Sequence, residues 1–132
     1  MRIQGLTLIG SGWHPFLFRS EIKALTGPIE VIHPRVVYIP LIDSTLELLS
    51  RAALLDDVLS IAGRYWVYSE TSQEDLSQTV AEWARLHLPE GSFAVRARKL
   101  GTGIPGFSRS EVESEIGALV MSDSNPVDLH DP

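Results

Sequence analysis

The order of strand-like and helix-like segments in the first half of the sequence restricts the fold more than any other feature. Short apolar runs alternate with segments whose apolar residues recur at helical spacing, and glycine or proline stands at several junctions. The resulting order is β-α-β-β-α-β, the split βαβ arrangement. The predicted strands cover residues 2–9, 29–33, 35–41 and a stretch around 65–68, and the predicted helices cover residues 17–26 and 43–52.

This order is that of the ferredoxin-like folds, so we predict a mixed α+β protein. The N-terminal domain, residues 1–68, would be the ferredoxin-like β-α-β-β-α-β segment. A second, α/β domain over residues 69–132 would pack against it. A length of 132 residues allows one domain or two small ones that share a core, and a hydrophobic content of 44% is sufficient for a folded chain.

The second half predicts two helices separated by an alternating strand and a glycine-rich loop. Thr71 and Glu74 have the capping-box spacing at the start of a helix that extends to about residue 87. Apolar and basic residues alternate over residues 93–100, as in a strand with one solvated face. Ser108 or Ser110 would cap the last helix, and a strand would begin at residues 127–129. The expected buried positions of the two helices are Leu76, Val80, Trp83, Val112, Ile116, Leu119 and Val120.

The loop contains Gly101, Gly103 and Gly106 at the G-x-G-x-x-G spacing of a dinucleotide-binding turn. The strand before such a turn is normally buried on both faces, whereas here Arg96 and Arg98 make one face solvated. A proline, a phenylalanine and a separate serine cap also stand between the loop and the next helix, which should begin at the loop. We therefore interpret the glycines as a turn and not as a nicotinamide or flavin site.

The basic residues around this loop are the candidate binding residues. Four of the eleven, Arg96, Arg98, Lys99 and Arg109, lie within fourteen residues that contain no acid, in a chain of net charge −6. Such a patch can hold phosphates. Backbone N–H groups at Gly101 and Gly103 would approach phosphate oxygens closely. The alternative is that the arginines form an ordinary solvated strand face beside a plain turn.

The run SFAVRARKLGTGIPGFSRSEVESEIGALV, followed by VDLHDP, resembles the THUMP domain of RNA-modifying enzymes. That family has an alternating basic strand, a loop, a helix with Glu-Ile-Gly, and then Val-Asp-Leu. The run LIGSGWHPFLFRSEIKAL resembles the N-terminal ferredoxin-like segment of archaeal-type tRNA guanosine N2-methyltransferases. The resemblance covers essentially all of the chain and is most specific over residues 93–129. His130 departs from it, since the family often has Lys or Asn there.

The resemblance implies that the chain binds the acceptor end of tRNA. It also implies that S-adenosylmethionine binds to a separate catalytic domain, because this chain has no Asp/Asn-Pro-Pro-Tyr-type motif. We therefore expect no catalytic residue and no cofactor in the chain itself. Further strands of a THUMP domain would follow residue 132, so the domain would be incomplete. Its unfinished strand edge would then be free to pair with a second copy in a homodimer.

Other classes of site are less compatible with the composition. The chain has no cysteine, and its four histidines are scattered without i, i+4 pairs, so we expect no disulfide and no metal site. No apolar run is long enough to span a bilayer and no signal peptide is recognisable, so we expect a cytoplasmic protein. Trp13 is the tryptophan for which stacking on nucleotides stays open; Trp83 is expected in the core, and Trp66 fits either role. The alternative function is a ferredoxin-like small-molecule or protein-interaction domain that does not bind RNA.

Overall fold

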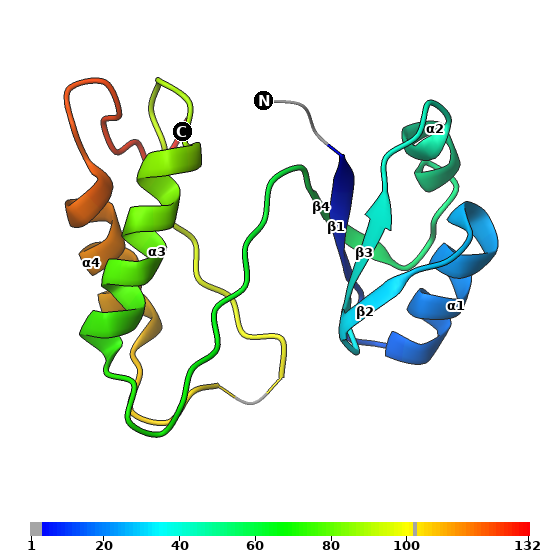
Figure 1. Ribbon diagram of the computed structural model, residues 1–132, viewed down its shortest axis with the longest axis horizontal. Helices are drawn as coiled ribbons and strands as arrows, with labels where there is room; N and C mark the ends of the chain where they lie inside the picture. Colours follow the sequence, from blue (N-terminus) through cyan, green and yellow to red (C-terminus); the bar gives the residue numbers. More distant parts are fainter. Residues whose placement is uncertain (1–3, 102) are drawn as a thin grey trace. The chain divides into compact units, whose positions relative to one another are not determined.

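The computed structural model describes residues 4–101 and 103–132. Its fold is mixed α+β, as predicted, and the described residues form a four-stranded antiparallel sheet and four helices (Figure 1). The chain divides into two compact units, Met1–Ala62 and Gly63–Pro132, and each is described here by itself. Residues 63–68, which we assigned to the first domain, are part of the second unit.

The first unit has the predicted split βαβ topology. The sheet order is β2-β3-β1-β4, and every neighbouring pair of strands is antiparallel. The central pair therefore consists of the first and third strands, as the β-α-β-β-α-β order requires. The elements are β1 (Gly5–Gly10), α1 (Pro15–Thr26), β2 (Glu30–His33), β3 (Val36–Pro40), α2 (Thr45–Leu49) and β4 (Leu55–Leu59).

The position of the last strand was predicted wrongly. We expected it around residues 65–68 because aromatic and β-branched residues favour strands, but those residues have no regular secondary structure. Strand β4 lies about ten residues earlier, pairing Leu59 with Thr7 and Val58 with Leu8. Its side chains are mostly exposed. Strand β4 is therefore defined by its backbone pairing with the buried central strand β1 and not by burial of its side chains. A strand of this kind has no clear hydrophobic pattern in the sequence.

The core of the first unit lies between the sheet and α1. Phe18 and Ile22 of α1 are fully buried against Leu8, Val37 and other sheet residues. Proline at the first helical position favours the start of α1, because its missing N–H would be unbonded there. The ring of Phe18 lies directly on the end of β1, where a Cβ atom on Gly10 would be 2.1 Å from its Cγ. Glycine at position 10 therefore permits this close packing.

The second unit is built on α3 (Gln73–His87) and α4 (Arg109–Val120), which pack against each other (Figure 1). A capping box begins α3, but it lies one residue later than predicted. The Ser72 hydroxyl accepts a hydrogen bond from the Asp75 N–H at 3.0 Å, and the Asp75 carboxylate accepts one from the Ser72 N–H at 3.2 Å. The Thr71 hydroxyl instead accepts from the backbone N–H of Tyr68 at 3.0 Å. A core of Ala81, Phe93, Val112, Ile116 and Val120 lies between the elements of this unit.

A buried polar contact fixes the start of α4 relative to α3. The Ser77 hydroxyl, 1% exposed, donates to the Glu115 carboxylate at 2.7 Å. The Gln73 amide donates to the other oxygen of Glu115 at 3.0 Å and accepts from the Ser108 N–H at 2.8 Å. The contact positions the end of the glycine loop, because Ser108 is bonded to Gln73. Every polar atom in the contact has a hydrogen-bond partner, so its burial carries no uncompensated desolvation cost.

The predicted strands at residues 93–100 and 127–129 are reduced to one parallel bridge, between Phe93 and Val127. The Phe93 N–H donates to the Pro126 carbonyl at 3.0 Å, and the Asp128 N–H donates to the Phe93 carbonyl at 2.9 Å. Further along, the Ala97 N–H donates to a glutamate side chain and not to a neighbouring strand. The two segments therefore lie side by side at the bridge, but the expected ladder does not form over the described residues.

Candidate nucleic-acid interface

The basic segment that follows Phe93 presents its charged side chains to solvent. Arg96, Arg98 and Lys99 are exposed, whereas Val95 and Ala97 between them are half-buried. Val95 packs on the core beneath α4. The alternation in the sequence is therefore present in the burial pattern even though the segment is not a regular strand, and it places the arginines on the side away from the core.

Arg96 also contacts the C-terminal segment. One guanidinium nitrogen, Nη2, donates to the Leu129 carbonyl at 2.7 Å. A guanidinium has five N–H donors, so this bond leaves others for an oxygen-rich ligand. The contact fixes the direction of the side chain. Less conformational entropy is then lost when the side chain binds a phosphate.

Lys99 lies over the glycine loop. A Cβ atom on Gly103 would be 2.8 Å from the Cε atom of Lys99 and 3.0 Å from its Nζ atom. Glycine at position 103 therefore lets the lysine side chain approach the loop backbone. Gly101 has a φ of +141°, which residues with side chains rarely adopt. The backbone conformation at Gly101 and the lysine packed against Gly103 therefore explain the presence of glycine at both positions, without a bound dinucleotide.

Arg109 is the first residue of α4 and directly follows the capping residue Ser108. The Ser108 hydroxyl accepts from the Glu111 N–H at 3.4 Å, so Ser108 is the cap and Ser110 is not. The Arg109 side chain is 65% exposed and its Nε atom is 3.9 Å from Oε1 of Glu113. The same carboxylate oxygen accepts from the Ala97 N–H at 3.0 Å.

Glu113 thus brings together residues that are distant in the sequence. Its Oε1 atom lies close to Arg109 and accepts from the Ala97 N–H, so Arg109 lies near the backbone between Arg96 and Arg98. We had not identified Glu113 as a site residue. No acidic residue occurs from residue 96 to residue 109 in the sequence, but in the folded chain the Glu113 carboxylate lies beside this segment. The i, i+4 spacing of Arg109 and Glu113 on one helix is the feature of the sequence that indicates their contact.

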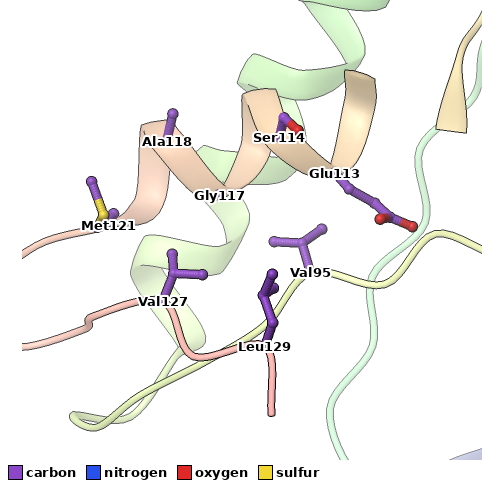
Figure 2. Close-up of a pocket in the computed structure, with 8 residues that line it drawn as sticks. All are labelled: Val95, Glu113, Ser114, Gly117, Ala118, Met121, Val127 and Leu129. Carbon is purple, nitrogen blue, oxygen red and sulfur yellow. The ribbon is translucent and has the colours of Figure 1, made fainter. Parts of the chain in front are cut away.

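An open groove lies next to this patch, between α4 and the paired segments around residues 95 and 127–129 (Figure 2). Figure 2 shows Val95 and Leu129 pointing from these segments toward α4. None of the candidate basic side chains lines the groove. Its lining is mostly apolar and consists of Val95, Glu113, Ser114, Gly117, Ala118, Met121, Val127 and Leu129.

The described residues differ from the arrangements that hold a metal ion. No three His, Asp or Glu residues among the described positions are grouped to hold a metal ion.

Backbone N–H groups of Asp131 and His130 donate to the Asp128 carboxylate and lower its pKa below the usual value. Asp128 is therefore ionised at neutral pH, where it fixes the turn after residue 127. Among the described helices, none has the length and apolarity needed to cross a membrane.

The three tryptophans differ in environment. Trp13 is 80% exposed in the loop before α1, in an edge contact with His14. Trp83 is half-buried and stacks on His87, with ring centroids 4.7 Å apart. Trp66, for which the sequence left both roles open, is 73% exposed.

Comparison with known proteins gives a match in structure alone. No family model matches the sequence, and no curated protein matches it. The fold is similar to the crystal structure of PH1313 from Pyrococcus horikoshii OT3, with a TM-score of 0.54 and 17% sequence identity. The match covers 97% of this chain and 48% of PH1313, so the chain spans about half the length of that protein. At this identity the similarity shows a shared fold.

Proposed function

We propose that this chain is an RNA-binding module that recognises the acceptor end of tRNA. The observation that carries the proposal is the exposure of Arg96, Arg98 and Lys99 before a glycine loop, with Arg109 linked to the same segment through Glu113. Exposed guanidinium and ammonium groups on one side of a segment are suited to the phosphates of a nucleic-acid backbone.

The resemblance of residues 93–129 to the THUMP domain supports this function and suggests its context. In that context the chain belongs to a cytoplasmic tRNA-modifying enzyme, an S-adenosylmethionine-dependent tRNA (guanine-N2-)-methyltransferase. The catalytic domain and its cofactor site would lie outside this chain. Gly101 and Gly103 then serve close approach of the RNA backbone, and the negative charge of the remaining surface disfavours nonspecific binding.

The groove of Figure 2 favours a second candidate, a protein-interaction domain. Met121 and Leu129 in its lining are 57% and 60% exposed, and exposed apolar surface of this kind occurs at protein interfaces. In this reading the arginines are only a solvated face. A homodimer in which two copies pair at residues 127–129 is one form that such an interaction would take.

Titration with tRNA separates the two functions. We expect the full chain to bind tRNA more tightly than a duplex DNA of similar length, at equal salt concentration, in a fluorescence anisotropy assay. The preference follows from a patch of fixed geometry, since nonspecific charge attraction alone would favour both polyanions similarly. Equal affinity for both, or no binding to either, would leave the protein-interaction function as the better explanation.

A further inference from the structure

Helix α4 begins with a capping box that its own residues do not complete. Ser108 and Glu111 have the S-x-x-E spacing of this motif, and the Ser108 hydroxyl accepts from the Glu111 N–H at 3.4 Å. In a complete box the Glu111 carboxylate would also accept from the Ser108 N–H. Here the Ser108 N–H donates instead to Oε1 of Gln73, a residue of α3, at 2.8 Å. The cap of α4 is therefore completed by another helix.

The side-chain amide of Gln73 also holds two carboxylates of α4. Its Nε2 atom donates to Oε2 of Glu111 at 3.1 Å and to Oε1 of Glu115 at 3.0 Å. An amide nitrogen has two hydrogens, so both are used. Ser77, one turn further along α3, donates to the other oxygen of Glu115 at 2.7 Å. Gln73 thus joins α3 to the cap and to the first two turns of α4.

These contacts require a side chain that donates and accepts at the same time. A carboxylate at position 73 could accept from the Ser108 N–H, but it would repel the carboxylates of Glu111 and Glu115. An ammonium group could donate to the two carboxylates, but it has no acceptor for the N–H. The half-buried amide of Gln73 satisfies all three partners.

The cap contact is adjacent to the RNA-binding patch. Ser108 directly precedes Arg109, so the bond to Gln73 fixes the backbone from which the Arg109 side chain leaves. Without Gln73, the Glu111 carboxylate could turn back to the Ser108 N–H and complete an ordinary capping box. Helix α4 would then keep its cap but lose this bond to α3. The expected result is a folded helix on which Arg109 is no longer held in one place.

We infer that Gln73 is a positioning residue of the RNA-binding patch, which acts through Ser108 to fix the place of Arg109. The inference rests on the proposed function and extends it to a polar contact that does not itself touch RNA. A basic side chain on a fixed backbone loses less conformational entropy when it binds a phosphate. Gln73 therefore strengthens the phosphate contact of Arg109.

The salt dependence of tRNA binding separates positioning from a general loss of stability, because destabilisation alone does not change the number of counterions released. We expect Gln73→Ala to weaken tRNA binding by roughly 2- to 10-fold, the range for one lost hydrogen bond. Its salt slope should flatten toward that of Arg109→Ala, by up to roughly 0.7–0.9. The double variant should have the slope of Arg109→Ala alone, since both changes remove the same phosphate contact. Gln78→Ala is the matched control, because it removes an exposed glutamine from the same helix and should leave the slope unchanged.

An exchange of the amide and the carboxylate gives an independent test. Gln73→Glu should flatten the slope as Gln73→Ala does, since three carboxylates would then lie together. Adding Glu115→Gln should restore the wild-type slope. The amide at position 115 can donate to the carboxylate at position 73 and accept from the Ser77 hydroxyl, while the Ser108 N–H keeps its acceptor. The exchanged pair has the net charge of the wild type, so long-range electrostatics does not explain a recovery.

The outcomes distinguish this inference from the proposed function. A wild-type slope in Gln73→Ala, with a flatter slope in Arg109→Ala, would overturn the positioning role and leave the basic patch standing. If Gln73→Ala does not fold, the exchanged pair decides, and a slope as flat as that of Gln73→Glu would overturn the role. A wild-type slope in Arg109→Ala would overturn both the phosphate contact of Arg109 and its positioning by Gln73. Failure of the wild type to bind tRNA would overturn both proposals.

Discussion

Replacement of Phe18 by alanine should lower the free energy of unfolding by about 3–5 kcal/mol, the range for loss of a buried phenylalanine. Phe18 is fully buried at the centre of the first unit's core, and its ring lies on the end of β1 at Gly10. On the side of β1 the space would stay open, because Gly10 has no side chain to move into it. Equilibrium denaturation in guanidinium chloride measures the effect.

The matched control is Phe16→Ala, two residues earlier on the same helix. Phe16 is 64% exposed, so its loss should change the free energy of unfolding by no more than about 0.5 kcal/mol. Equal destabilisation by both substitutions would contradict the position of α1 relative to the sheet.

Replacement of Ile116 by alanine should lower the free energy of unfolding by about 2–5 kcal/mol. Ile116 is 5% exposed and packs in the core of the second unit with Ala81 and Phe93. The loss has a local consequence, because α4 and Val95 of the basic segment both pack on this core. Hydrogen exchange should therefore show reduced protection of backbone amides in α3 and α4.

Met121→Ala is the corresponding control, since Met121 directly follows α4 and is 57% exposed. It should change stability by no more than about 0.5 kcal/mol. Loss of protection in Met121→Ala as large as that in Ile116→Ala would mean that the burial of α4 is described incorrectly.

Most of the first unit could be predicted because its strands and helices have distinct periodicities. The β-α-β-β-α-β order follows from apolar spacing. Strand β4 could not be located, because its side chains are largely exposed and the aromatic residues 65–68 gave a stronger but misleading β signal. Its position depends on backbone pairing with β1, which side-chain pattern does not reveal.

The local structure around the candidate residues was predicted in part, while their role in binding stays a prediction. Alternation along residues 93–99 indicated which side chains are exposed, and Ser108 was one of two predicted caps. The i, i+4 spacing indicated a contact of Glu113 with Arg109, but its contact with the Ala97 N–H could not be predicted, because it joins two segments through a loop of unknown course. The capping box of α3 was placed one residue early because Thr71–Glu74 and Ser72–Asp75 both fit the spacing. Only the contact of Thr71 with Tyr68 resolves that choice.

The central claim is that the exposed basic side chains bind RNA phosphates, and salt dependence tests it most directly. The logarithm of the tRNA binding constant should be measured against the logarithm of salt concentration for the wild type and for Arg96→Ala, Arg98→Ala, Lys99→Ala and Arg109→Ala. Each lost phosphate contact reduces the number of released counterions and flattens the slope by roughly 0.7–0.9. Arg51→Ala is the charge-matched control, since Arg51 is an exposed residue of the first unit.

Val95→Ala is a second control: it should reduce stability through the core without altering the slope. The account predicts flatter slopes for the four basic variants, similar across RNA sequences because phosphates carry no base identity, and an unchanged slope for Arg51→Ala. Wild-type slopes in Arg96→Ala and Arg98→Ala, with tRNA binding otherwise intact, would contradict it.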